Sequence, residues 1–283
     1  MNSSGQTPVN SAAAQYEAEA LRLAAALDPA AVSTHEYRFG SEPCDILDVL
    51  APAGDAEGPR PVMVFFHGGG FTHGTRSWNS FMAPALHRAG MILVTPEYPL
   101  LAPGSPGPVQ MDAVTRALGW VRENAATFGG DPARIFIGGH SAGAALAAAF
   151  SLRPDLLAQA GLGEGGLRGV LCMSGSLNRW AITGTDGASY DLPPGPLPVA
   201  PDAPLALLDN AAVPTFVTWG TNERQLARVE RSSRTLIDAY TAKGVPVRTL
   251  VQEGEDHFTA HLAIADVDGA LAAAVAEWVD RLR

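Results

Sequence analysis

The sequence is poor in cysteine and in positive charge. Its 283 residues include two cysteines, Cys44 and Cys172, and no Cys-x-x-Cys or Cys/His ligand spacing occurs, so we predict two buried or half-buried thiols and no metal site. Lysine and arginine number 19 against 29 acidic residues, which gives a formal net charge of −10. A protein that binds nucleic acid or an anionic membrane surface needs a basic face, so this balance argues against both partners.

Long hydrophobic runs are also missing. No stretch of 18 consecutive apolar residues occurs, which argues against a membrane-spanning helix. The first 15 residues contain no basic segment followed by an apolar core, so we expect no signal peptide and a cytoplasmic protein. Hydrophobic residues make up 47% of the chain and charged residues 17%, a composition that suits a large buried core and not a disordered chain.

The N-terminal part of the chain carries weak signals. Residues 1–14 are rich in Ser, Ala, Asn and Gln, so we predict that they are disordered and that a single domain covers 15–283. A short helix is expected over 16–27. Two strands are expected next, at 35–39 and 45–50, and the tight turn between them suggests an antiparallel edge.

Buried strands then alternate with helices. Apolar, strand-like runs occur at 61–66, 91–94, 134–138, 170–173, 215–219 and 247–252. Apolar residues at helical spacing predict helices over 109–128 and 263–282. This alternation predicts an α/β fold, with a mostly parallel sheet of about eight strands and helices on both faces. The Pro-rich segment 176–212 breaks the rhythm, and we interpret it as a cap insertion over the strand ends.

The most informative motif is Gly-His-Ser-Ala-Gly at 139–143, between a strand pattern and an Ala/Leu-rich helix pattern. A strand-to-helix turn of this form holds a serine hydroxyl out at the edge of a sheet, in a strained backbone geometry. The glycines on either side allow the strand and the helix to approach closely. We therefore predict that Ser141 is a nucleophile.

A serine nucleophile needs a base, and the base needs an orienting acid, both from the ends of later strands. Glu223 follows the strand at 215–219 and is the predicted acid, whereas Asp209 precedes that strand and Glu230 lies well into the next helix. His257 follows the strand at 247–252 and is the predicted base. Its rival is His261, and the His-x-x-x-His spacing of the two leaves a metal site as an alternative, without a third ligand nearby.

The reaction also requires donors for an oxyanion. The motif His-Gly-Gly-Gly-Phe at 67–71 leaves the strand at 61–66, and its glycines allow backbone N–H groups to point inward. We assign the amides of Gly69 and Gly70 to this role, together with that of Ala142 at the helix N-terminus. Neither a Walker motif nor a dinucleotide-binding fingerprint is present, so no phosphate cradle is expected.

Residues 35–283 resemble the α/β-hydrolases, and within that fold the esterases similar to hormone-sensitive lipase and to kynurenine formamidase. The resemblance rests on five motifs: those at 67–71 and 139–143, Tyr-Pro-Leu-Leu-Ala-Pro at 98–103, Gly-Thr-Asn-Glu at 220–223 and Asp-His-Phe at 256–258. The histidine in the serine motif and the pair His-Phe favour the formamidase-like branch. This chain departs from that branch with Phe71 in place of Trp, and from the esterases with Pro99 in place of Arg.

These residues predict a cofactor-free serine hydrolase that cleaves a small or medium carboxylic ester. Three alternatives stay open: hydrolysis of an aryl formamide such as N-formylkynurenine, non-hydrolytic acyl transfer or lactone closure, and a non-catalytic binding module. The expected partner is a small-molecule ester or amide, and a homodimer is possible. Five residues near the serine or in the cap insertion are candidate substrate contacts: Phe71, His140, Arg179, Trp180 and Tyr190.

Overall fold

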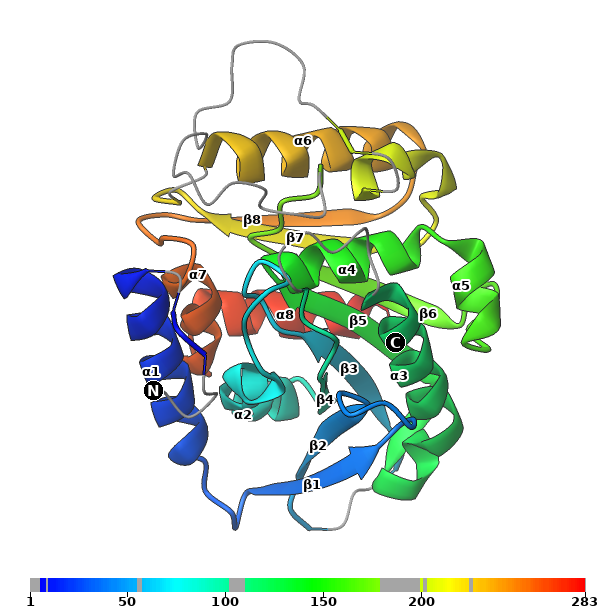
Figure 1. Ribbon diagram of the computed structural model, residues 1–283. Helices are drawn as coiled ribbons and strands as arrows, with labels where there is room; N and C mark the ends of the chain where they lie inside the picture. Colours follow the sequence, from blue (N-terminus) through cyan, green and yellow to red (C-terminus); the bar gives the residue numbers. More distant parts are fainter. Residues whose placement is uncertain are drawn as a thin grey trace.

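One sheet runs through the part of the chain that the computed structural model describes, which comprises residues 6–8, 10–54, 58–101, 110–178, 199–200, 203–223 and 226–282. Eight described strands form it in the order β1-β2-β4-β3-β5-β6-β7-β8, with β1 at one end and β8 at the other (Figure 1). Strands β1 to β8 span Val32–Arg38, Ile46–Pro52, Arg60–Phe66, Ile92–Pro96, Gly130–His140, Leu167–Met173, Thr215–Gly220 and Val247–Gln252.

The strand directions follow the expected pattern. The pairs β1–β2 and β2–β4 are antiparallel, and every other neighbouring pair is parallel. The predictions of a mostly parallel sheet and of an antiparallel edge are therefore confirmed. Parallel neighbours need crossover connections, and helices supply most of them in this chain.

Helices cover both faces of the sheet. Helices α1 to α8 span Ser11–Ala25, Ala83–Arg88, Gln110–Asn124, Ala142–Ser151, Pro154–Gln159, Leu226–Ala242, Thr259–Leu262 and Ala270–Arg281. The 3-10 helices η1 to η5 span Arg76–Met82, Ala125–Phe128, Pro204–Ala206, Leu208–Asn210 and Ala263–Ala265. Helices α3, α4 and α6 pack on one face, and α1, α2 and α8 pack on the other.

The central strand β3 is buried on both sides. Val62, Val64 and Phe66 join the core on the α3/α4 face, whereas Met63 and Phe65 join the core on the α1/α8 face. Successive side chains of a strand point to opposite faces, so a strand that is covered twice is apolar at every position. This explains the continuous hydrophobic run in the sequence.

Helix α1 begins earlier than predicted. The Asn10 side chain accepts a hydrogen bond from the amide of Ala13 at 2.9 Å and caps a helix that starts at Ser11. The predicted boundary of disorder at residue 14 is therefore wrong, because a capping asparagine followed by alanines favours helix.

The C-terminal helix is interrupted. The side chain of Asp266 accepts from the amide of Asp268 at 3.1 Å, and the chain turns there before α8 begins at Ala270. The predicted continuous helix over 263–282 is thus a 3-10 turn, an Asp-initiated loop and a shorter helix.

The predicted cap insertion lies largely outside the described residues. The described residues near its two ends pack together. The amide of Ala200 donates to the Asn178 carbonyl at 2.8 Å, and the amide of Leu205 donates to the Leu177 carbonyl at 3.1 Å. The role of 176–212 as a cap stays a prediction.

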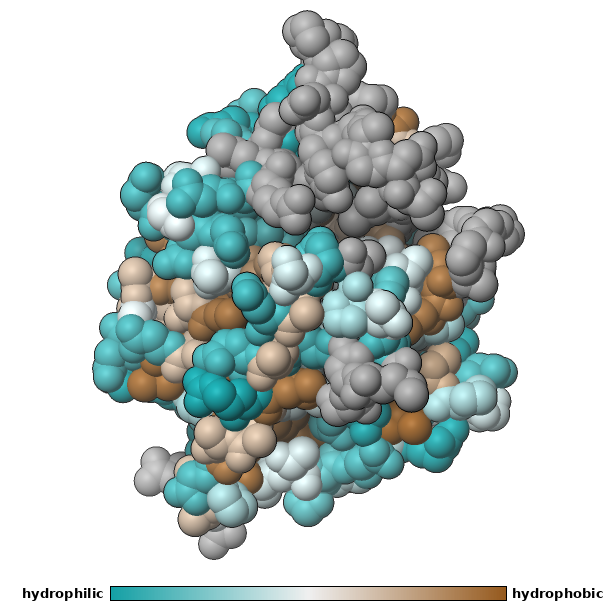
Figure 2. Space-filling view, turned by 60° about the vertical axis from the view of Figure 1, so that its left-hand side comes forward, coloured by the Kyte–Doolittle hydropathy of each residue, from teal (hydrophilic) through white to brown (hydrophobic). Residues whose placement is uncertain are grey.

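The surface of the described chain is mixed in polarity. Its exposed large hydrophobic side chains are Val199 and Val251, at 43% and 42% exposure. On the face drawn in Figure 2, hydrophobic residues form small separate patches among hydrophilic ones. Among the described residues, no helix has the length and apolar character required to cross a membrane.

Candidate active site

Ser141 occupies the turn between β5 and α4. Its backbone has φ 55° and ψ −114°, an unfavourable conformation for a residue with a side chain, and its amide donates to the Met173 carbonyl at 2.8 Å. A Cβ atom at Gly139 would overlap with the backbone of Gly143, and one at Gly143 would overlap with the carbonyl oxygen of Phe66. Both glycines are therefore required for the close packing that holds this turn.

The structure brings together Ser141, His257 and Glu223, as the sequence predicted. The Nε2 atom of His257 lies 2.9 Å from Ser141 Oγ, and its Nδ1 atom lies 3.0 Å from Glu223 Oε2. The Glu223 side chain is fully buried, while that of His257 is 25% exposed. A neutral imidazole in this arrangement donates from Nδ1 to the carboxylate and accepts the serine proton at Nε2.

The rival acids lie elsewhere. Asp209 is exposed in η4. Glu230 pairs with Arg234 on the surface of α6 through a contact of 2.6 Å. Neither carboxylate contacts a ring nitrogen of His257 in the described structure.

The loop that carries His257 is tied to the turn that carries Glu223. The amide of Asn222 donates to the Glu255 carbonyl at 2.9 Å, and a Cβ atom at Gly220 would overlap with that same carbonyl. The side chain of Asp256 accepts from the amides of Phe258 and Thr259, both at 2.8 Å. Burial of Asp256 opposes its ionisation, but these two amides and the Thr259 side chain hold its pKa below the ordinary value. Glu223 and His257 are therefore fixed relative to each other.

The glycine-rich loop after β3 passes directly beside the serine. A Cβ atom at Gly68 would lie 3.2 Å from Ser141 Cβ. Gly69 and Gly70 have φ values of 111° and 62°, which glycine adopts readily. Within the described residues, the amides of Gly69, Gly70 and Ala142 donate to no protein acceptor. Among the described residues, the loop beside Ser141 and the first turn of α4 thus keep three amide donors without a protein acceptor.

A buried polar group under this loop was missed by sequence reasoning. The ring of His67 stacks on Tyr98 at a centroid distance of 4.1 Å and donates from Nδ1 to the Gly68 carbonyl at 2.7 Å. Glu97 lies 3.4 Å from the other ring nitrogen of His67 and accepts from the Thr75 hydroxyl at 2.6 Å. Burial alone would raise the pKa of Glu97, but the interaction with His67, together with the Thr75 hydroxyl, lowers it to about 2. Glu97 directly precedes the motif at 98–103, and that position was the only available signal.

Two of the predicted substrate contacts have another place in the structure. His140 is 1% exposed, and its Nε2 atom donates to the carbonyl of His257 at 2.8 Å. Phe71 is 4% exposed, packs in the core and accepts at its carbonyl from the Leu101 amide. Both expectations are corrected, because burial leaves these side chains no open surface.

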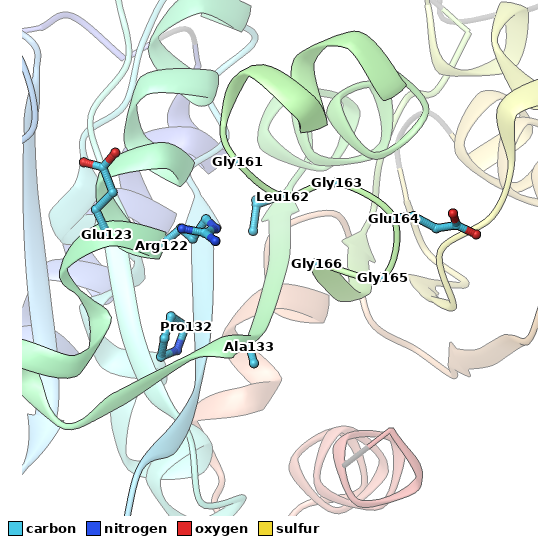
Figure 3. Close-up of a pocket in the computed structure, with 10 residues that line it drawn as sticks. All are labelled: Arg122, Glu123, Pro132, Ala133, Gly161, Leu162, Gly163, Glu164, Gly165 and Gly166. Atoms are coloured by element: carbon cyan, nitrogen blue, oxygen red, sulfur yellow. The ribbon is translucent and has the colours of Figure 1, made fainter.

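The three other predicted contacts, Arg179, Trp180 and Tyr190, lie outside the described residues. A hollow of about 660 Å³ elsewhere is lined by the segment 161–166 together with Arg122, Glu123, Pro132 and Ala133 (Figure 3). It adjoins the amino ends of β5 and β6, whereas Ser141 follows the carboxyl end of β5. Ligand sites of such sheets lie at the carboxyl ends, so this hollow is separate from the candidate site.

His261 does not share a site with His257. Its Nδ1 atom lies 2.9 Å from the Tyr16 hydroxyl and its Nε2 atom lies 3.3 Å from the Met82 sulfur, so both ring nitrogens have partners in the core. In the described part of the chain, no three His, Cys, Asp or Glu side chains are grouped to hold a metal ion.

Comparison with known proteins gives a family match and a fold match. The model of the carboxylesterase family matches residues 9–191. Esterase B1 from Culex pipiens is 37% identical over 109 residues, which cover 35% of this chain and 20% of that protein. A protein named probable N-octanoylanthranilate hydrolase from Rhodococcus erythropolis is 38% identical over 112 residues, which cover 37% of this chain and 25% of that protein.

The chain thus spans about a fifth to a quarter of the length of these curated relatives. The similarity to solved structures extends further. Esterase B from Lactobacillus rhamnosis superposes with a TM-score of 0.73, covering 97% of this chain and 93% of that chain, at 18% identity. That likeness shows a common α/β-hydrolase fold.

Proposed function

The chain belongs to the carboxylesterase family, and from this premise we propose that it is a serine hydrolase that cleaves a carboxylic ester through Ser141, His257 and Glu223. One observation carries the proposal. The serine hydroxyl, the imidazole and the buried carboxylate form a continuous chain of contacts of 2.9 and 3.0 Å, with the serine on a strained strand-to-helix turn.

The first half of the reaction forms an acyl-enzyme. Ser141 Oγ attacks the ester carbonyl carbon while its proton passes to His257 Nε2. Glu223 accepts the Nδ1 hydrogen bond throughout and balances the positive charge that develops on the ring. The carbonyl oxygen becomes an oxyanion, and we assign its donors to the free amides of Gly69, Gly70 and Ala142. Collapse of the tetrahedral intermediate completes the acyl-enzyme: the bond from carbon to the alcohol oxygen breaks, and His257 delivers its proton to that oxygen.

The second half releases the acid. Water then gives its proton to His257 and attacks the acyl carbon, and collapse of the second intermediate returns the proton to Ser141. No cofactor takes part in this scheme.

A labelling experiment tests the proposal. A fluorophosphonate is expected to modify Ser141, and a panel of p-nitrophenyl esters of increasing chain length is expected to be hydrolysed. Ser141→Ala is expected to lose the label and at least about 10⁴-fold in kcat with the fold retained. Equal ester hydrolysis by this variant would contradict the assignment, and an unlabelled, inactive wild type would favour a binding module.

Hydrolysis of an aryl amide is a second candidate. It is supported by the relative whose name is N-octanoylanthranilate hydrolase, since its named substrate is an N-acylated aryl amine, and by the formamidase-like motifs at 139–143 and 256–258. N-formylkynurenine and an N-acylanthranilate belong in the same assay panel. Turnover of these amides without turnover of the esters would promote this candidate over the first.

A further inference from the structure

The N-terminal helix α1 packs beside the loop that carries His257, and Figure 1 shows α1 next to α7. Tyr16 is its contact residue and is 3% exposed. The ring of Tyr16 stacks on Phe258 at a centroid distance of 5.0 Å and meets Trp78 edge-on at 5.5 Å. Phe258 directly follows His257, so α1 contacts the immediate neighbour of the proposed base.

The hydroxyl of Tyr16 has a specific partner. It lies 2.9 Å from Nδ1 of His261, whose Nε2 atom lies 3.3 Å from the Met82 sulfur. A thioether sulfur accepts but cannot donate, so His261 donates from Nε2 and accepts the Tyr16 proton at Nδ1. Burial, with a smaller contribution from His257, lowers the pKa of His261 to about 3, and burial raises that of Tyr16, so both groups stay neutral.

A second buried imidazole, that of His140, packs against His261. The ring of His140 stacks on that of His261 at 4.6 Å and 13°. Its Nε2 atom donates to the backbone carbonyl of His257 at 2.8 Å, which requires a proton on Nε2. Burial, reinforced by His261 and His257, holds the pKa of His140 well below its ordinary value. His140 therefore links the backbone of the nucleophile turn to the backbone of the base.

We propose that Tyr16 is a positioning residue for His257, acting through the stacked rings of His261 and His140, so that helix α1 is part of the catalytic arrangement. This inference rests on the proposed function. Two contacts hold His257: His140 donates a hydrogen bond to its carbonyl, and Tyr16 packs on the adjacent residue, Phe258. Its Nε2 atom has to stay within hydrogen-bond reach of Ser141, and small displacements of a reacting group are costly to the rate.

The test compares two buried tyrosines. Tyr16→Phe removes the hydroxyl that orients His261 and keeps the ring that packs on Phe258. Tyr240→Phe is the matched control, because it also removes the hydroxyl of a buried tyrosine, 1% exposed, but one that lies in the core on the other face of the sheet. Thermal unfolding is expected to show that both variants keep the fold.

Catalysis is expected to separate the two variants. We expect Tyr16→Phe to lower kcat about fivefold with KM unchanged, and Tyr240→Phe to leave both constants unchanged, when kcat is expressed per site titrated by the fluorophosphonate. Equal kcat per titrated site in the wild type and Tyr16→Phe would overturn the positioning role and leave the proposed function intact. A wild type that neither labels nor turns over esters or amides would overturn both.

A second pair of variants examines the link at His140. His140→Leu removes the donor to the His257 carbonyl and is expected to lower kcat about 100-fold per titrated site. His140→Gln places an amide N–H near the position of Nε2 and is expected to recover kcat to within about tenfold of the wild type. Equal losses in the two variants would contradict the role assigned to this hydrogen bond.

Discussion

Replacing Glu223 by glutamine tests the charge arrangement of the site. In the wild type, the Gly220 amide donates to Glu223 Oε1 at 3.4 Å. The substitution keeps the size of the side chain and an oxygen that can accept this hydrogen bond. It removes the negative charge 3.0 Å from His257 Nδ1, at a side chain that water does not reach. The change should therefore affect the transition state, in which the ring is positively charged, more than substrate binding.

The magnitude follows from the geometry. With the centres of the two charges about 4 Å apart and an effective dielectric of about 20, Coulomb's law gives about 4 kcal/mol. At about 1.4 kcal/mol for each factor of ten, this is a loss of about 10³-fold in kcat. The amide can also turn its NH₂ group toward Nδ1 and so force the proton onto Nε2, which leaves no acceptor for Ser141 and extends the loss toward about 10⁴-fold.

Steady-state kinetics on a p-nitrophenyl ester measure this loss, with circular dichroism to confirm the fold. Asp209→Asn is the matched control, because it also neutralises a carboxylate but at an exposed position. Its kcat should equal that of the wild type, and KM should change little in either variant. A Glu223→Gln variant within tenfold of the wild type, or a greater loss of activity in Asp209→Asn than in Glu223→Gln, would contradict the role proposed for the Glu223 charge.

Two further predictions concern the glycine-rich loop and the buried histidines. Gly69→Ala should lower kcat at least about 100-fold, the effect of losing one oxyanion donor, because its Cβ would overlap with the His73 carbonyl. Gly54→Ala has a similar positive φ of 94° in open space and should leave kcat unchanged, and equal activity of the two variants would exclude a role for the loop. The pKa of His261 is about 3 in the folded chain, whereas its ordinary value is 6.5. As the pH falls below 6.5, the unfolded chain therefore binds a proton at this residue that the folded chain does not bind. The contribution of His261 to the free energy of unfolding is thus fully present only above that pH. Between pH 7 and pH 5 the free energy of unfolding in urea should fall by about 2 kcal/mol through this group. His261→Phe should remove that part of the fall and substitution of the exposed His35 should not; identical pH dependence in His261→Phe and the wild type would contradict this account.

Much of the fold was predictable because its signals are local. The run at 61–66 is apolar at every position since β3 is covered on both faces, and the motif at 139–143 requires glycines because two backbones meet there. Parallel strands bring their carboxyl ends to one edge of the sheet. Glu223 and His257 could therefore be selected by their positions after β7 and β8 alone.

Other features depend on contacts between residues far apart in the chain. The burial of Phe71 and His140, which argues against the substrate roles expected for them, was not predicted, because no local pattern reveals that a residue beside Ser141 is buried. The interaction of Glu97 with His67 joins the ends of two neighbouring strands and was equally invisible.

Local patterns in the sequence were sufficient to identify the residues at the strand ends, and with them the chemistry proposed for the chain. The contacts that hold those residues in place appear only in the folded structure. Tyr16 and His261 are 245 positions apart and meet because α1 and α7 pack against the same face of the sheet. Such a contact depends on the packing of the whole chain, since spacing and periodicity record only what neighbouring residues do.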